Sequence, residues 1–195
     1  RLQPAIDLLA RIPLDAPQSV VDLGCGPGNV TPLLKQRWPD AEIVGLDNSD
    51  EMLARAREAV PEVRFENVDV SNWKPDRKYD VIFSNAALQW VTGHETLFPS
   101  IAAQVAPGGI LAVQMPRNFE APSHSTMLDV IRGGPWEDLL EPVWVAVPTQ
   151  APTFYYDLLD PLARDLQIWE TEYVQVLEGE NPVAEYTKEI GRAHV

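Results

Sequence analysis

Cysteine and long apolar stretches are scarce in this chain of 195 residues. Cys25 is the only cysteine, which excludes an intrachain disulfide and a zinc site built from several thiolates. No apolar run approaches the roughly 20 residues that a membrane-spanning helix needs. No basic segment followed by an apolar one opens the sequence, as it would in a secretory signal. We therefore expect a cytoplasmic protein that uses no metal ion.

Positive charge is also sparse, with 15 Lys and Arg against 29 Asp and Glu and a formal net charge of -14. Nucleic acids and anionic membranes are bound through clusters of Lys and Arg, and the sequence contains no such cluster. We therefore expect neither a nucleic acid nor a membrane as partner. A small anionic substrate is compatible with this charge if a local Arg or His offsets the long-range field. Nothing in the sequence indicates the oligomeric state.

The length and the hydrophobic share of 45% are typical of one globular domain, so we expect residues 1–195 to fold as a single unit. The 18 prolines are densest after Met115. This distribution predicts a regular half at 1–116 and a loop-rich half at 117–195.

Short apolar runs alternate with helical patterns in the regular half. Strands are expected at residues 19–23, 42–46, 63–66, 79–84 and 110–114, the last after a turn at 107–109. Helices are expected at residues 2–11, 29–38, 94–106 and from a cap at Asn48 or Ser49 to about 60. This rhythm predicts an α/β fold, a Rossmann-like doubly wound sheet that is mostly parallel with helices on both faces.

The loop-rich half gives weaker patterns. A helix is expected at residues 123–132, and a loop with Trp136 and Trp144 at 133–152. Residues 166–177 are a candidate sixth strand, and residues 182–189 a candidate short helix.

The most informative segment is the loop after the first expected strand. Asp22 ends that strand, and Gly24, Gly26 and Gly28 follow at alternate positions. Ligands bind beyond the carboxyl ends of such strands, and glycine permits a close backbone approach. The spacing G-x-G-x-G differs from the G-x-G-x-x-G of dinucleotide sites. An acid before the loop suits a cationic amine, which S-adenosylmethionine carries together with a sulfonium and no phosphate. A tight β–α turn is the simpler alternative.

Two further acids follow the second and third strands. Asp47 can accept hydrogen bonds from both hydroxyls of a ribose, unless it only caps the next helix. Asp69 can take an adenine amino group, with a backbone contact from Val70, unless it is only a solvated turn residue. Acids at the ends of three successive strands favour a nucleoside site over three independent coincidences.

Asp22 to Asn29, Asp47, Asp69 and Asn85 resemble the cofactor-site motifs of class I S-adenosylmethionine-dependent methyltransferases. Within that group the sequence is most similar to the trans-aconitate methyltransferase family. The similar stretches are residues 4–9, 22–29, 85–90, 111–116, Asn118 and 168–171, and the resemblance extends from residue 1 to about 191. The glycine loop specifies only the cofactor, whereas residues 85–90 and 114–118 are more specific.

The resemblance implies S-adenosylmethionine as cofactor, S-adenosylhomocysteine as its product, and no metal. The implied cofactor-binding residues are Asp22, Gly24, Cys25, Gly26, Gly28, Asn29, Asp47, Asn48, Met52, Asp69, Val70 and Asn85. Residues 1–116 then form the cofactor-binding half, and 117–195 the substrate side.

The implied reaction esterifies a carboxylate of a small polycarboxylic acid such as trans-aconitate. A carboxyl group has an unperturbed pKa near 4, so it is ionised at neutral pH and no base is required. Positioning groups are therefore expected in place of acid–base catalysts. The candidates are Gln89, Trp90, Arg117, Asn118 and His124.

Each candidate has a structural alternative. Gln89 could hold a carboxylate oxygen, and Trp90 could exclude water or merely fill the core. Arg117 suits bidentate binding of carboxylates but could be a surface residue, and its position is not matched within the family motif. His124 could donate to the substrate, cap a helix or lie on the surface. Three tyrosines could line the acid pocket or belong to the core: Tyr155, Tyr156 and Tyr173.

Two departures from the family affect these expectations. Its members begin with a segment that carries aromatics and closes over the cofactor, and they continue to a last antiparallel strand between strands five and six. We find no candidate for either in this sequence. If the chain ends at Val195, we expect a gap or an exposed edge in the sheet.

Three rival functions are kept open. The first is a carboxyl methyltransferase of the malonyl-carrier-protein type, which residues 85–90 also resemble. The second is a non-catalytic protein that binds S-adenosylmethionine. The third is a nicotinamide oxidoreductase, which the glycine spacing disfavours.

Overall fold

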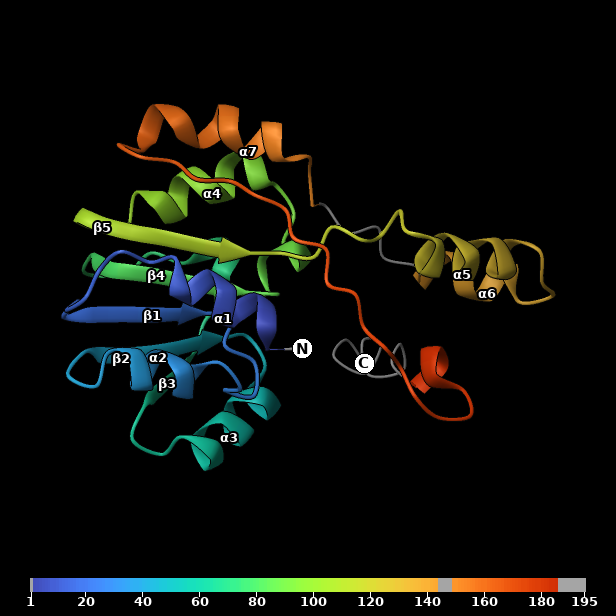
Figure 1. Ribbon diagram of the computed structural model, residues 1–195, viewed down its shortest axis with the longest axis horizontal. Helices are drawn as coiled ribbons and strands as arrows, with labels where there is room; N and C mark the ends of the chain where they lie inside the picture. The colour runs from blue at the N-terminus through green and yellow to red at the C-terminus, as the bar shows by residue number, and fades with distance from the viewer. Residues whose placement is uncertain (1, 144–148, 186–195) are drawn as a thin grey trace.

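A computed structural model describes residues 2–143 and 149–185. Its centre is a five-stranded sheet with the order β3-β2-β1-β4-β5, in which every neighbouring pair is parallel (Figure 1). The strands are β1 (Ser19–Leu23), β2 (Glu42–Asp47), β3 (Arg64–Asn67), β4 (Tyr79–Asn85) and β5 (Val105–Gln114). The predicted fold class is confirmed.

Helices connect these strands and extend the second half. The α-helices are α1 (Gln3–Ala10), α2 (Thr31–Arg37), α3 (Asp50–Ala59), α4 (His94–Ala102), α5 (Pro122–Arg132), α6 (Glu137–Leu140) and α7 (Pro152–Leu159). The 3-10 turns are η1 (Val70–Asn72), η2 (Leu88–Trp90), η3 (Glu141–Val143) and η4 (Asp160–Leu162). None of the helices in the described ranges is long and apolar enough to cross a membrane.

The apolar strands supply a core on each face of the sheet, because successive side chains of a strand point to opposite faces. Val20 packs with residues of α1, α2 and α3, whereas its neighbour Val21 packs with residues of α4 and with Tyr155 of α7. Ile43 and Val44 divide in the same way. Continuous apolar strands therefore signal burial on both sides, as in other parallel sheets covered by helices.

The second half adds two separate parts to this sheet. Helices α5 and α6 extend beyond the ends to which the strand arrows point, whereas α7 returns to lie against α4 (Figure 1). The sheet formed by the first half of the chain is thus covered partly by residues from the second half.

Several predicted boundaries require correction. The turn expected at 107–109 lies inside β5, where Tyr79 pairs with Val105 and Val81 already pairs with Ile110. A Cβ at Gly109 would lie 2.7 Å from the Asp80 carbonyl oxygen, so this irregularity brings the two backbones very close. The helix expected at 94–106 ends at Ala102, because β5 begins at Val105. The loop expected at 133–152 contains α6 and η3, and α7 was not predicted.

The sixth strand expected at 166–177 is wrong. A strand needs a backbone partner, and β4 is the only ladder partner of β5 among the described residues. Side chains hold the segment instead: Trp169 lies under the Arg11 guanidinium, and Tyr173 donates a hydrogen bond to Asp7. Val174, further along the same segment, is exposed.

The last predicted elements fall partly outside the described ranges. Residues 182–185 are helical, in agreement with the helix expected at 182–189, whereas 186–189 are not described. Trp144 also lies outside the described residues, and Trp136 precedes α6.

Candidate active site

The three strand ends that the sequence singled out lie side by side. β1 is central, and its Asp22 is level with Gly45 of β2 and Phe83 of β4. The chain adds β2 and β3 on one side of β1 and then returns to add β4 on the other. In open α/β sheets this reversal of strand order creates the crevice in which ligands bind. The glycine loop, Asp47 and Asn85 therefore border one crevice.

The glycine loop needs glycine for two different reasons. Gly24 has a φ of 75°, and a Cβ there would lie 2.2 Å from the Ala87 Cβ, so the loop packs directly against the turn that follows β4. Gly26 has a φ of 54°, yet nothing lies within 4 Å of the position a Cβ would take. Its backbone thus borders open space, into which a ligand can approach without meeting a side chain.

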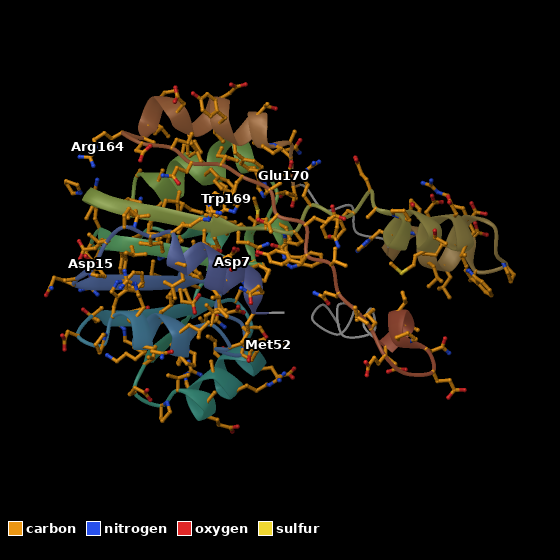
Figure 2. The ribbon with its side chains drawn as sticks, viewed as in Figure 1. Asp7, Asp15, Met52, Arg164, Trp169 and Glu170 are labelled. Carbon is orange, nitrogen blue, oxygen red and sulfur yellow. The ribbon has the colours of Figure 1, made fainter. Side chains whose placement is uncertain are left out.

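Asp47 joins the two loops at this opening. Its Oδ2 accepts a hydrogen bond from the Gly26 N–H at 2.8 Å, and its Oδ1 accepts one from the Ser49 N–H at 2.9 Å. Each oxygen keeps a second lone pair for the hydroxyl of a ligand. The cap of α3 is Ser49, whose Oγ accepts from the Met52 N–H at 3.3 Å, so the capping alternative for Asp47 is wrong. Met52 itself lies at this end of the sheet (Figure 2).

Asp22 is a buried carboxyl group beside the loop, with an exposed fraction of 2%. Burial raises its pKa to about 6, the charge of Asp47 adds to the rise, and the hydrogen bond from Thr31 opposes it. Thr31 Oγ1 donates to Asp22 Oδ2 at 2.7 Å. No Lys or Arg within residues 2–143 and 149–185 forms an ion pair with Asp22. The site therefore has a negative charge that a cationic ligand can neutralise.

Cys25 contributes to the core through its side chain. The thiol is buried among residues of the α1–α3 face, and burial raises its pKa, so it stays protonated. Its backbone N–H donates to the Leu46 carbonyl at 2.9 Å. Asn29 and Asn48 are exposed beside the loop and after β2. The cofactor-binding roles expected for these three residues stay predictions.

Asp69 is an exposed turn residue that caps η1. Its Oδ1 accepts from the Ser71 N–H at 2.9 Å and from the Ser71 hydroxyl at 2.7 Å. These bonds hold the pKa of Asp69 below its usual value. Val70 follows and packs against the α4–α7 core. The geometry matches the turn alternative, and the adenine contact of Asp69 and Val70 stays a prediction.

Two buried side-chain oxygens at the end of β4 and in the turn after it have no hydrogen-bond partner in the described part of the chain. Ala86 has a φ of 53°, a left-handed conformation that is costly for any residue with a Cβ. Gln89 is 2% exposed, and its Nε2 donates to the Ala86 carbonyl at 2.7 Å. Gln89 Oε1 and Asn85 Oδ1 are both buried without a hydrogen-bond partner among the described residues. Because such atoms are costly to bury, they indicate that a ligand donor completes the site.

Trp90 and His124 meet across a residue that the sequence did not single out. The Phe119 ring lies 6.3 Å from the Trp90 ring and 5.0 Å from the His124 ring, both edge to face. His124 is 8% exposed, and burial lowers its pKa. The surface alternative for His124 is therefore wrong. The sequence could have pointed to Phe119, because it is an aromatic residue that lies between the candidate residues Asn118 and His124.

Arg117 is exposed and already paired. Its Nε donates to Glu170 Oε1 at 2.6 Å, and this hydrogen bond raises the pKa of the guanidinium. Glu170 lies on the segment that crosses from α7 toward α1 (Figure 2). Asn118 is exposed, and its carbonyl accepts from the Ala121 N–H at 3.0 Å. Arg117 is thus a surface residue, as the structural alternative expected. The acid-binding roles of Arg117 and Asn118 stay predictions.

The three tyrosines differ in environment. Tyr155 belongs to the α4–α7 core, Tyr156 is 49% exposed, and Tyr173 donates to Asp7 Oδ2 at 2.6 Å. The core alternative is confirmed for Tyr155. No group of three or more His, Cys, Asp and Glu within the described ranges is arranged to hold a metal ion.

Residues 20–109 match the family described as a methyltransferase domain. Over 191 residues the chain is 47% identical to trans-aconitate 2-methyltransferase from Azoarcus sp. (strain BH72), covering 98% of this chain and 75% of that relative. The chain belongs to the trans-aconitate 2-methyltransferase family. It is therefore a methyltransferase, as the sequence resemblance predicted.

Solved methyltransferase structures share the fold of this family member. A putative methyltransferase from Haloferax volcanii, solved in complex with a methyltransferase activator, has a TM-score of 0.64 at 22% identity. It covers 83% of this chain, which in turn covers 67% of it. Coclaurine N-methyltransferase, solved with N-methylheliamine and SAH, has a TM-score of 0.52 at 21% identity, over 57% of this chain and 35% of that chain. Both likenesses concern the fold alone.

Proposed function

We propose that this methyltransferase uses S-adenosylmethionine to esterify a carboxylate of a small polycarboxylic acid, with trans-aconitate as the leading candidate. The observation that carries the proposal is the opening at Gly26, where Asp47 accepts a hydrogen bond from the Gly26 N–H and the buried Asp22 has no cationic partner among the described residues. Backbone access beside two acids fits a nucleoside that carries an ammonium group. A diphosphate would meet repulsion at the same place.

Different residues around the opening would bind different parts of the cofactor. Asp22 with the loop Gly24, Cys25, Gly26, Gly28 and Asn29 would hold its amino-acid end. Asp47, Asn48 and Met52 would hold the ribose, and Asp69 with Val70 the adenine. The unpartnered oxygens of Asn85 and Gln89 suit donors or positive charge on the same ligand. Residues 1–116 would thus bind the cofactor and 117–195 complete the acid side.

The chemistry calls for positioning. When bound, the cofactor supplies a methyl group on a sulfonium, so that a carboxylate oxygen gains the methyl and a neutral ester and thioether remain. No proton has to be removed, since the carboxylate is ionised at neutral pH. Gln89 keeps a second N–H on Nε2 with which to orient a carboxylate oxygen. Trp90 and Phe119 would exclude water, which strengthens the interactions between charges in the site.

The acid side would recognise further carboxylates of the substrate. The Arg117 guanidinium donates a hydrogen bond to the Glu170 carboxylate, and a substrate carboxylate would compete for the same donor. Burial lowers the pKa of His124, and a ring N–H of this residue would donate a hydrogen bond to the substrate. Asn118 lies between them in the chain and would add an amide.

A methyl-transfer screen over small di- and tricarboxylic acids tests the proposal. We expect turnover on an unsaturated tricarboxylic acid, release of S-adenosylhomocysteine, and calorimetric binding of S-adenosylhomocysteine but not of NAD. Turnover restricted to an acylated carrier protein would favour the malonyl-carrier-protein alternative. Binding of S-adenosylhomocysteine without turnover on any acid would favour a non-catalytic binding protein. Absence of binding would overturn the proposal entirely.

A further inference from the structure

His94 is a buried histidine outside the motifs that led to the site. It is the first residue of α4 and is 2% exposed. Both ring nitrogens have partners: Nδ1 lies 2.7 Å from the Tyr155 hydroxyl oxygen, and Nε2 lies 2.9 Å from the Leu88 carbonyl oxygen. His94 therefore links α7, in the second half of the chain, to the turn η2 beside the site.

In the neutral His94 ring, the Leu88 carbonyl sets the direction of the two hydrogen bonds. A carbonyl oxygen only accepts, so Nε2 carries the hydrogen and donates to Leu88. Nδ1 then accepts from the Tyr155 hydroxyl, whose oxygen accepts in turn from the Gln150 N–H at 3.0 Å. The result is an oriented chain of hydrogen bonds from Gln150 through Tyr155 and His94 to Leu88.

The series of hydrogen bonds ends at Leu88, in the strained turn that carries Gln89 and Trp90. Leu88 opens η2, and the next residues are Gln89 and Trp90. The turn begins at Ala86 in a left-handed conformation, which is strained for a residue with a Cβ and persists only when the surroundings hold it. Gln89 stabilises the turn from within through the Ala86 carbonyl. The bond from His94 holds it from a separate helix.

The surroundings of the histidine make these bonds specific. The Phe98 ring lies 5.2 Å from the His94 ring and 5.0 Å from the Tyr155 ring, and Phe154 packs 5.2 Å from Tyr155. In such an apolar enclosure a ring nitrogen that loses its partner finds little water to replace it. A change of ring orientation would therefore be transmitted to the Leu88 carbonyl.

We propose that His94 is a positioning residue for methyl transfer: it holds the Leu88 carbonyl so that Gln89 and Trp90 face the substrate, and Tyr155 fixes its ring. The inference rests on the proposed function, because it assigns Gln89 and Trp90 to that reaction. It adds residues that touch neither cofactor nor substrate and that come from α4 and α7.

Two substitutions of His94 each keep one of its two hydrogen bonds and remove the other. Gln at position 94 can place its Nε2 near the histidine Nε2, which keeps the bond to Leu88 and loses the bond to Tyr155. Asn can place its Oδ1 near the histidine Nδ1, which keeps the acceptor for Tyr155 and loses the bond to Leu88. We expect His94→Gln to retain kcat within about threefold and His94→Asn to lose about tenfold. The KM for S-adenosylmethionine should change little in either variant.

A residue that only packs α4 against α7 would give a different result. Both variants would then lose thermal stability together, while kcat per folded enzyme would be the same in each. Equal kcat values in His94→Gln and His94→Asn, with an active wild type, would overturn this inference alone. Absence of wild-type turnover on every acid, with S-adenosylhomocysteine still bound, would overturn the proposed function and this inference with it.

Nitrogen NMR of the wild-type protein, with labelled histidine, gives a test that does not depend on the folding of a variant. We expect a single tautomer of His94 with the hydrogen on Nε2, both in the wild type and in Tyr155→Phe, because the Leu88 carbonyl still accepts from Nε2 in that variant. A hydrogen on Nδ1, or a mixture of tautomers in the wild type, would contradict the oriented chain of bonds and with it the proposal.

Discussion

The Asp47 carboxylate and the Gly26 N–H are joined by a hydrogen bond of 2.8 Å. The bond connects the end of β2 to the glycine loop at the one loop glycine whose missing side chain leaves open space. Asp47 thus shapes the opening and offers lone pairs to whatever enters it. Because Asp47 has both roles, its substitution is a direct test of the proposed cofactor site.

Replacing Asp47 with Ala should weaken binding of S-adenosylhomocysteine by at least about tenfold. The variant loses both the acceptor for the ribose and the bond that orders the loop, each a hydrogen bond to a charged group of about 1.5–3 kcal/mol. Isothermal titration calorimetry measures the effect. Asp40→Asn, which changes an exposed acid in the turn before β2, should bind as the wild type does. Similar affinity in both variants would remove Asp47 from the site.

Replacing Gly26 with Ala separates ligand access from backbone strain. A methyl group would enter the opening, and the left-handed φ of 54° would cost about 1–2 kcal/mol of stability. Gly108→Ala is a matched control, because Gly108 also has a positive φ of 80° with nothing within 4 Å of its Cβ position. Both variants should unfold at similarly reduced temperatures. Only Gly26→Ala should lose affinity for S-adenosylhomocysteine, by more than about tenfold.

Replacing Asp22 with Asn should stabilise the folded chain at neutral pH. The pKa of Asp22 rises from 3.8 to about 6 on folding, so the folded state holds this proton more tightly than the unfolded state. The stability that this preference contributes is fully present below pH 3.8 and is lost as the pH rises through about 6. The loss amounts to at most about 3 kcal/mol.

Thermal unfolding at several pH values checks the sign. Asp22→Asn should gain most over the wild type at pH 7 and lose its advantage near pH 4, since Asn can still accept the Thr31 hydrogen bond. Affinity for S-adenosylhomocysteine should decrease in the same variant, because a neutral amide cannot neutralise an ammonium group. A variant less stable than the wild type at pH 7 would contradict the burial argument.

Replacing Glu170 with Gln should lower the KM for the acid substrate by about two- to threefold. The ion pair with Arg117 is exposed and therefore weak, and in this variant a substrate carboxylate no longer has to displace it. Arg117→Ala should raise the same KM. Glu141→Gln removes a similarly exposed pair, in which Arg132 Nε lies 2.7 Å from Glu141 Oε1, and should leave KM unchanged. An unchanged KM in Glu170→Gln would make the pair purely structural.

The sheet, and the meeting of the glycine loop with Asp47 at its carboxyl edge, could be predicted from local patterns. Consecutive apolar residues at Val20-Val21 and Ile43-Val44 indicate strands whose side chains are buried on both faces of the sheet, as the structure shows. Because parallel strands end at one edge, acids at their ends had to share a crevice. The glycine spacing likewise predicts the backbone of a single loop, because glycine is the residue that most readily adopts a positive φ.

The acid side depended on contacts between distant parts of the chain. Residues 166–177 have a strand-like composition but no partner among the described strands, so side-chain contacts with Arg11, Asp7 and Arg117 determine their course. The partner of Arg117 is 53 residues away, and that of His94 in α7 is 61 residues away. Backbone conformation is largely a local property, and sequence patterns report it well. The pairing of side chains requires that the whole fold first bring them within about 3 Å of each other, and only the tertiary structure decides which pairs meet.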